Sequence, residues 1–137
     1  MIGVIIITHG TLSEQLLETA ELIMGQAAEV HAVSFTARES LEELRQKALA
    51  AMENYQSEGC LILTDIMGGS ATNVCVELMK MEKVEVVTGV NLPMVLEAIG
   101  YREGADLKAL ASKVLESGIR SIINLKEFFE KRAAKKK

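Results

Sequence analysis

Residues 1–10 of the chain read MIGVIIITHG, and this stretch decides the fold. Met1–Thr8 is an almost continuous apolar run, rich in β-branched side chains. Such a run is typical of a strand that is buried on both faces, as strands are in parallel sheets between two layers of helices. The run stops at His9 and Gly10, which predicts a turn there. The opening stretch therefore predicts an α/β fold.

The remainder of the chain alternates strand-like and helix-like patterns. Thr11 with Glu14, and Ser40 with Glu43, have the spacing of helix capping boxes. Apolar side chains then recur three and four residues apart, as on one face of a helix. The further runs that predict strands are Val30–Phe35, Gly59–Thr64, Val84–Thr88 and the shorter Ile119–Asn124. We therefore predict a three-layer, open, mostly parallel sheet of five strands with helices on both faces.

Length and composition predict the domain organisation. The 137 residues suit one domain, and a composition that is 49% hydrophobic but only 4% aromatic predicts an aliphatic core. We expect residues 1–124 to form the domain, with Asp106 capping a helix that stops at Gly118, ahead of the fifth strand. Residues 125–137 combine two phenylalanines with many basic side chains, and we expect them to form a C-terminal basic amphipathic tail helix.

Charge and hydropathy exclude several classes of protein. The net charge is −4, and no aromatic residues alternate with the lysines of the basic C-terminal end, so we expect no nucleic-acid binding. No stretch approaches the roughly 18 apolar residues of a membrane span, and the apolar start lacks the charged segment and cleavage site of a secretion signal. Cys60 and Cys75 lie in apolar patterns, as reduced buried thiols do. We therefore expect a cytoplasmic protein without direct membrane insertion.

Two polar side chains follow the predicted strands at the edge where such sheets bind ligands, the carboxyl ends of the strands. His9 ends the first strand, and a neutral imidazole is a competent nucleophile. Asp65 follows the third strand, where a carboxylate could accept the ring N–H of His9 and offset the charge of the ring. The structural alternative for Asp65 is a turn aspartate that accepts hydrogen bonds from backbone N–H groups. His31 lies at the start of the second strand and lacks this context.

The turn Gly68-Gly69-Ser70 opens the next helix and completes the candidate site. N–H groups at a helix N-terminus, together with the helix dipole, bind anions, and the Ser70 hydroxyl adds a donor. An N-cap role alone would also explain Ser70. Thr8 could point its hydroxyl at the same place, although a threonine that ends a strand is common. The sequence thus predicts a phosphate site without metal or cofactor, because it has no ligand-like His/Cys/Asp cluster.

Three ordered motifs resemble the IIA component of mannose-type sugar phosphotransferase systems. They are THG at residues 8–10, TDIMGGSATN at residues 64–73 and TGVNLPMVLEA at residues 88–98. The resemblance covers the chain up to its tail. It implies that His9 carries the phosphoryl group, that Asp65 orients His9, and that the Gly68-Gly69-Ser70 turn cradles the phosphate. The family often has a proline after GGS where this chain has Ala71, and we expect the turn to tolerate the change.

The resemblance also implies a reaction and partners. The protein would be a phosphotransferase that accepts phosphate on His9 from the histidine-containing phosphocarrier protein and passes it to a separate IIB component for sugar uptake. We expect a homodimer, because members of the family are commonly dimers and in some cases exchange the edge strand. Met67, Leu92 and Met94 could form an apolar rim for a docking protein.

Three other functions compete with this interpretation. A phosphocarrier subunit for dihydroxyacetone phosphorylation would differ after the aspartate, where GGSATN is not typical. A regulatory module whose phosphorylation is sensed by a transcriptional activator usually sits inside a longer chain. A histidine-type phosphatase needs an arginine immediately before His-Gly, and this chain has Thr8 there. Phosphotransfer to a sugar transporter is therefore the leading hypothesis.

Overall fold

Four parallel strands form the centre of the molecule. The computed structural model describes residues 1–55, 58–66 and 68–135, with the backbone alone of Ser70. In this part of the chain the strands are β1 (Gly3–His9), β2 (Val30–Phe35), β3 (Cys60–Thr64) and β4 (Val84–Val87). They pair in the order β2-β1-β3-β4, so the stretch that opens the chain is a central strand.

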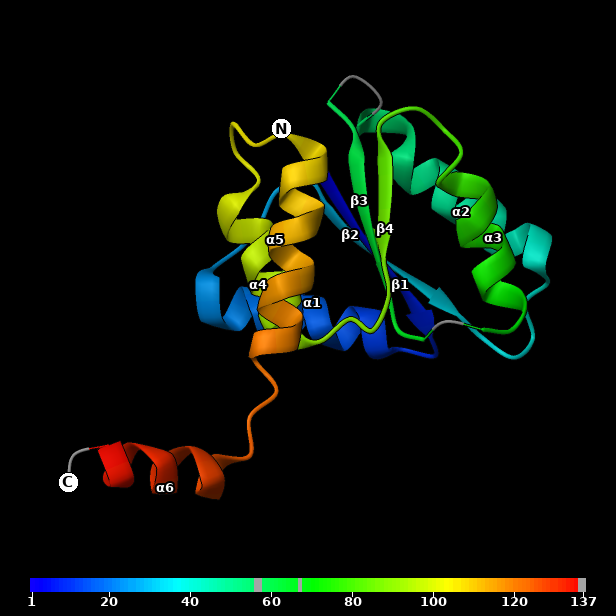
Figure 1. Cartoon of the computed structure of the whole chain (residues 1–137). Coiled ribbons are helices and arrows are strands. Elements are labelled where there is room, and N and C mark those ends of the chain that lie inside the picture. Colours follow the sequence, from blue (N-terminus) through cyan, green and yellow to red (C-terminus); the bar gives the residue numbers. More distant parts are fainter. Residues whose placement is uncertain (56–57, 67, 136–137) are drawn as a thin grey trace.

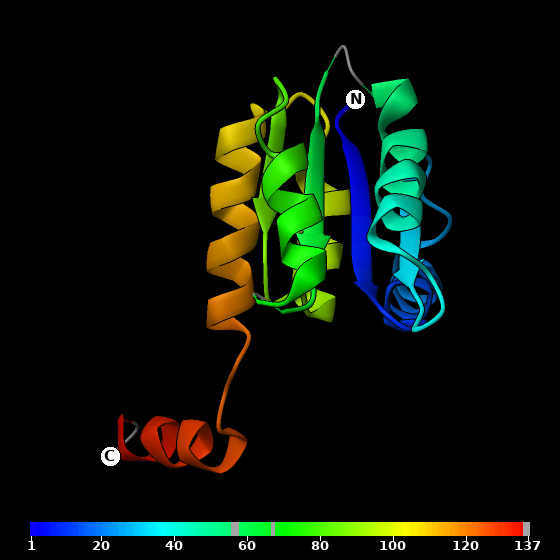
Figure 2. The same ribbon diagram turned by 90° about the vertical axis from the view of Figure 1, so that its right-hand side faces the viewer.

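Helices cover both faces of the sheet (Figures 1 and 2). One face carries α1 (Leu12–Met24), α4 (Leu92–Tyr101) and α5 (Leu107–Arg120). The other face carries α2 (Leu41–Met52), the short 3-10 helix η1 (Glu53–Tyr55) and α3 (Ser70–Leu78). The predicted α/β architecture with a parallel sheet between two helical layers is confirmed.

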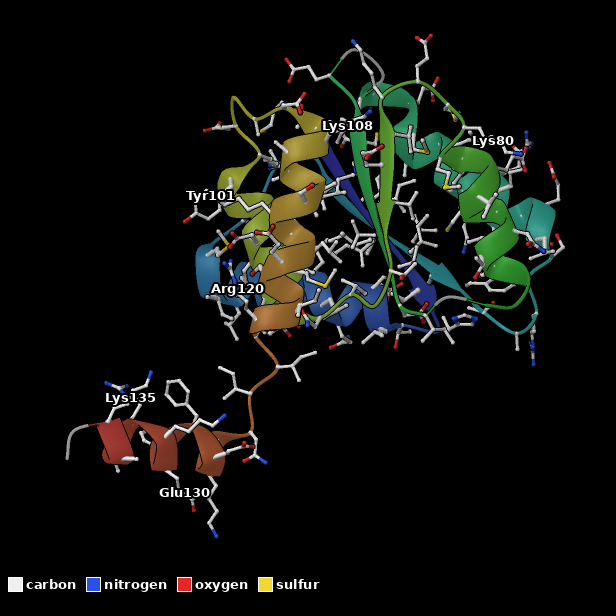
Figure 3. The ribbon with its side chains drawn as sticks, viewed as in Figure 1. Lys80, Tyr101, Lys108, Arg120, Glu130 and Lys135 are labelled. Atoms are coloured by element: carbon white, nitrogen blue, oxygen red, sulfur yellow. The ribbon has the colours of Figure 1, made fainter. Side chains whose placement is uncertain are left out.

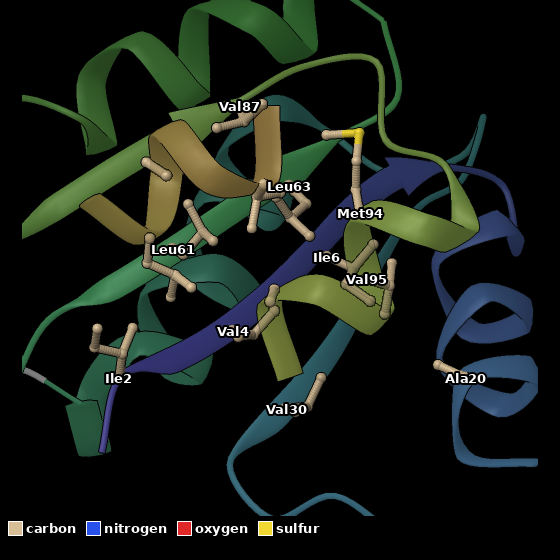
Figure 4. Close-up of a cluster of buried hydrophobic side chains, with 14 residues drawn as sticks. Ile2, Val4, Ile6, Ala20, Val30, Leu61, Leu63, Val87, Met94 and Val95 are labelled. Carbon is tan, nitrogen blue, oxygen red and sulfur yellow. The ribbon is translucent and has the colours of Figure 1, made fainter. Parts of the chain in front are cut away.

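The pattern of the opening stretch explains its burial on both sides. Side chains alternate along a strand, so Val4 and Ile6 pack into the cluster under α4 and α5, whereas Ile5 and Ile7 pack into the cluster under α2. Figure 4 shows the first of these clusters, in which Met94 of α4 is buried together with side chains of the sheet. A strand with two buried faces needs an unbroken apolar run, and that is what this sequence provides.

The prediction of a fifth strand was wrong. Residues 119 and 120 continue α5, and Ser121–Asn124 form an irregular segment. Gly118 does not stop the helix; it is buried inside α5, where a Cβ would lie 2.6 Å from the sulfur of Met94. The glycine therefore serves the close packing of α5 on α4. Apolar β-branched residues after it suggested a strand, but Ile122 and Ile123 are exposed to solvent here.

A buried arginine holds the amino ends of the strands. Arg102, which follows α4, donates hydrogen bonds from its guanidinium to the backbone carbonyls of Ile2, Ala28 and Glu29. These carbonyls lie just before β1 and β2, so the arginine ties the two strand starts to the end of α4. The carboxyl ends of the strands, at the opposite edge, remain available for chemistry.

The last helix, α6 (Leu125–Lys135), stands clear of the sheet and its two helical layers (Figures 1 and 2). None of its described residues is buried. Figure 3 shows Glu130 and Lys135 on this helix, away from the rest of the molecule. Two lysines of the basic end, Lys136 and Lys137, lie outside the described residues.

Candidate active site

His9 and Asp65 meet at the carboxyl edge of the two central strands. His9 is the last residue of β1, and Gly10 follows it with a φ of +58°, which turns the chain sharply toward α1. Ile7 pairs with Thr64 in the register of β1 and β3, so Asp65 follows level with Thr8 and within hydrogen-bonding reach of His9. The parallel sheet thus brings together two side chains that are 56 residues apart in the sequence.

One carboxylate oxygen of Asp65 accepts two hydrogen bonds from His9. Oδ2 lies 3.0 Å from the backbone nitrogen and 2.9 Å from ring Nδ1 of His9. The other oxygen, Oδ1, accepts the backbone N–H of Ile66 at 2.9 Å. The arrangement fixes both the backbone and the ring of His9 relative to the carboxylate.

The pKa of Asp65 reports the balance of this environment. Burial by itself would raise the pKa of the carboxyl group, but the hydrogen bonds from the backbone and ring of His9 and from Ile66 outweigh it and hold the pKa below its usual value. Asp65 is therefore an anion at neutral pH and can only accept hydrogen bonds. It follows that Nδ1 of His9 carries the ring proton, and that Nε2 of the neutral ring carries the lone pair.

The ring of His9 is accessible from solvent, whereas its partner is sheltered. The side chain of His9 is 49% exposed and that of Asp65 only 17%. The ring of Phe35, from the end of β2, is tilted by 56° against the imidazole, with the ring centres 6.0 Å apart. Beside this pair, an open hollow of about 590 Å³ is lined by His9 and by residues that lead from β2, Phe35, Thr36 and Ala37. A partner could reach His9 from this side.

Residues of the second motif, TDIMGGSATN, line a small hollow of about 20 Å³ beside the His9–Asp65 pair. His9, Asp65 and Phe35 line it together with Ala71, Thr72 and Cys75 of α3. Cys75 is not a rival nucleophile, because burial, and then the negative charge of Asp65, raise the pKa of its thiol.

The predicted phosphate turn adopts a conformation that only glycine takes readily. Gly68 and Gly69 have φ values of +116° and +77°. Gly69 is the N-cap of α3 and has no side chain to close over the first turn of the helix. The N–H of Gly68 is already engaged, because it donates to Oγ1 of Thr72 at 2.8 Å. The side chain of Ser70 and all of Met67 lie outside the described part of the chain.

Of two threonines at the site, the sequence predicted Thr8 and missed Thr72. The hydroxyl of Thr8 accepts the backbone N–H of Ser13 at 2.7 Å and is buried, so it helps to start α1; a role in phosphate binding stays a prediction. Thr72 was not predicted as a site residue. The signal available was its position four residues after Gly68, from which a hydroxyl can bond back to that backbone.

His31, Leu92 and Met94, which the sequence also singled out, make contacts other than with the His9–Asp65 pair. His31 is paired through Nδ1 with the hydroxyl of Tyr55 at 2.8 Å, on β2. Leu92 and Met94 belong to the cluster under α4 and α5. In the described residues, no group of three or more histidine, cysteine or acidic side chains could hold a metal. None of the described helices has the length and apolar character needed to cross a bilayer.

Comparison with known proteins decides the family. Residues 3–115 match the family described as the fructose IIA component of the phosphotransferase system, designated EIIA-man. The chain belongs to this family. The match spans both motifs that form the site, and it favours a sugar IIA component over the dihydroxyacetone subunit and the regulatory module.

Individual relatives agree with this IIA assignment. The chain is 34% identical to the mannose-specific EIIAB component of Escherichia coli (strain K12) over 127 residues, which cover 88% of the chain but 39% of that protein. It is 32% identical to the fructose-specific EIIA component of Bacillus subtilis (strain 168), covering 96% and 91%. The crystal structure of phosphotransferase system component EIIA from Streptococcus agalactiae superposes with a TM-score of 0.85 at 29% identity, covering 93% and 99%. The chain spans about two fifths of the length of the mannose-specific EIIAB component.

Proposed function

We propose that this IIA component is a phosphotransferase that carries a phosphoryl group on Nε2 of His9. One observation carries the proposal: Nδ1 of His9 donates to the anionic Asp65, and the other ring nitrogen is left with its lone pair on a half-exposed ring. An imidazole held in one tautomer and orientation by a carboxylate is the arrangement that favours attack by the free nitrogen.

The transfer step needs no net movement of protons at His9. The lone pair of Nε2 attacks the phosphorus of a phosphohistidine on the donor, in line with the bond that breaks. The old phosphorus–nitrogen bond returns its electron pair to the donor ring, and the new bond leaves the His9 ring with a positive charge. Asp65 stabilises that charge through the Nδ1 proton, which stays on the ring.

The turn before α3 would hold the phosphate oxygens. N–H groups near Gly69 and Ser70 lie at the positive end of the helix dipole, and the hollow beside His9 reaches the first turn of this helix. Such fixed donors stabilise the charge on the equatorial oxygens of a transferring phosphoryl group.

The partners follow from the chemistry and the family. The donor is the histidine-containing phosphocarrier protein, and the acceptor is a IIB component on a separate chain that serves sugar uptake. Exposed apolar side chains follow both halves of the site, Leu12 after His9 and Ile66 after Asp65, and they suit contact with a protein surface. A cytoplasmic location follows from these partners.

We further propose that the protein is a homodimer. In residues 115–129, all of which the structure describes, seven large apolar side chains are exposed, from Leu115 and Ile119 at the end of α5 to Phe128 and Phe129 on α6. The others are Ile122, Ile123 and Leu125. β4, one of the two edge strands of the described sheet, lies against α5. A second copy that covers this C-terminal run would remove an apolar surface that soluble monomers rarely expose.

Phosphorylation in a reconstituted relay tests the proposed activity. The protein is incubated with phosphoenolpyruvate, enzyme I and the phosphocarrier, and the added phosphate is measured before and after mild acid. We expect one acid-labile phosphate on the wild type and on His31→Ala, and none on His9→Ala. A wild type that gains no phosphate refutes the activity. Labelling of His9→Ala refutes the site.

A further inference from the structure

We propose that Thr72 is the positioning residue of the phosphate turn: its hydroxyl locks the Gly68 peptide so that the first turn of α3 is set before phosphate arrives. This inference rests on the proposed function of the site. In this inference Gly68 does not bind phosphate, because its N–H is bonded to Thr72. The N–H groups of Gly69 and Ser70 are left to donate to the phosphate.

The hydroxyl of Thr72 makes two bonds to one residue. Oγ1 accepts the N–H of Gly68 at 2.8 Å and donates to the carbonyl of Gly68 at 2.8 Å. The single hydroxyl hydrogen goes to the carbonyl and a lone pair receives the N–H, so both bonds form together. The pair fixes the N–H and the carbonyl of Gly68 relative to α3.

The two glycines of the turn have no side chains whose packing could restrain their backbone. Gly68 and Gly69 both have positive φ values, and glycine loses more conformational freedom on becoming ordered than any other residue. A Cβ placed on either glycine would meet no described heavy atom within 4 Å beyond the chain neighbours, so there is open space in the direction of each Cβ. Gly69 also brings no side-chain cap to α3. The bonds from Thr72 therefore restrain a segment that would otherwise sample many conformations.

The location of Thr72 connects this restraint to the chemistry. Thr72 lines the same small hollow as His9 and Asp65, so a change in the turn alters the surroundings of the reacting ring. Donors that are set in advance cost no reorganisation when charge develops on the phosphoryl group. Loss of the hydroxyl should thus slow the transfer step more than it weakens the docking of the donor protein, which contacts a wider surface.

Valine and serine at position 72 separate the hydroxyl from the shape of the side chain. Thr72→Val keeps the branched shape without the hydroxyl, and Thr72→Ser keeps the hydroxyl. We expect Thr72→Val to lower the maximal rate of phosphate transfer from the phosphocarrier by about tenfold, with an unchanged half-saturating concentration of phosphocarrier. Thr72→Ser should stay close to the wild type. Thr19→Val, on the exposed side of α1, is the matched control and should not change the rate.

A proline at position 71 distinguishes positioning from direct contact with phosphate. Ala71 is the second residue of α3, and this protein already accommodates Pro93 at the second position of α4. Proline fixes φ in the first turn of a helix. Ala71→Pro should therefore restore much of the rate lost in Thr72→Val if the hydroxyl acts by ordering the turn. If the hydroxyl binds phosphate itself, the proline cannot replace it, and the positioning role is refuted.

Amide exchange gives a readout that does not depend on activity. By NMR, the amide hydrogen of Gly68 should exchange with solvent at least severalfold faster in Thr72→Val than in wild type, and at nearly the wild-type rate in Thr72→Ser. Wild-type labelling together with wild-type rates and exchange in Thr72→Val would overturn this inference and leave the proposed function intact. A wild type that accepts no phosphate would instead refute the proposed function.

Discussion

At the scale of single residues, Asp65 determines which nitrogen of His9 is reactive. In Asp65→Asn the amide can donate as well as accept, so it no longer requires the proton on Nδ1, and it brings no negative charge. We expect the rate of phosphate transfer to His9 to fall on the order of 100-fold, measured under single-turnover conditions. The melting temperature controls for folding. A folded Asp65→Asn variant that transfers phosphate at the wild-type rate would contradict the role of Asp65.

The lowered pKa of Asp65 also predicts a pH dependence of stability. A carboxyl group whose pKa is lower in the folded state stabilises the protein above the unfolded pKa, and this contribution is lost as the pH falls through the folded pKa. The free energy of unfolding of the wild type should therefore fall more steeply than that of Asp65→Asn below about pH 4. Urea titrations at several pH values measure the difference. If the free energies of unfolding of the two proteins fell in parallel with pH, folding would not lower the pKa of the Asp65 carboxyl group.

The sequence places His9 and Asp65 together because residues that follow neighbouring parallel strands meet at one edge. Their exact hydrogen bonds, with one oxygen serving both the backbone and the ring of His9, depend on local geometry that no motif encodes. Thr72 was missed although it lies four residues after Gly68, because that spacing permits the contact but does not require it. Its contact arises only because two glycines fold back in left-handed conformations ahead of the helix.

At the scale of elements, the contact between β1 and η1 depends on a glycine. Gly3 lies in β1, and a Cβ there would be 2.4 Å from ring atoms of the buried Tyr55. We expect Gly3→Ala to lower the free energy of unfolding by about 1–3 kcal/mol, because neither strand nor ring can retreat without cost. Chemical denaturation measures the change.

The matched control for Gly3→Ala is a glycine in a helix. Gly100 lies in α4, and a Cβ there would meet only the terminal methyl of Met24, at 3.4 Å. Gly100→Ala should be neutral or stabilising by up to about 1 kcal/mol, because alanine has the higher helix propensity. Equal destabilisation by both substitutions would contradict the contact between Gly3 and Tyr55.

Elements with long, regular patterns were predicted correctly, whereas the predicted strand at residues 119–124 was wrong. The unbroken apolar run of β1 has one physical interpretation in a chain of this size. The apolar run after Gly118 has two interpretations, because β-branched residues occur in strands and also on exposed surfaces that bind a second chain. Gly118 itself gives no local signal that its close neighbour is Met94, a residue of another helix.

At the scale of the whole molecule, the exposed C-terminal run predicts self-association. Ile122 is 79% exposed in a single chain, so Ile122→Glu should not affect folding of the monomer, but it would bury a charge in a dimer. We expect light scattering to show a dimer for the wild type and a monomer for Ile122→Glu. Met81→Glu, on the loop between α3 and β4, is the control and should remain dimeric. A monomeric wild type would contradict the dimer.

The central claim concerns one nitrogen atom, and NMR can observe it directly. The protein, labelled with ¹⁵N in its histidine rings, is phosphorylated by the relay, and the ring nitrogen bonded to phosphorus is identified by its shift and its coupling to ³¹P. The account predicts phosphate on Nε2 of His9, with Nδ1 still protonated and His31 unchanged. Phosphate on Nδ1 of His9, or on His31, would contradict it.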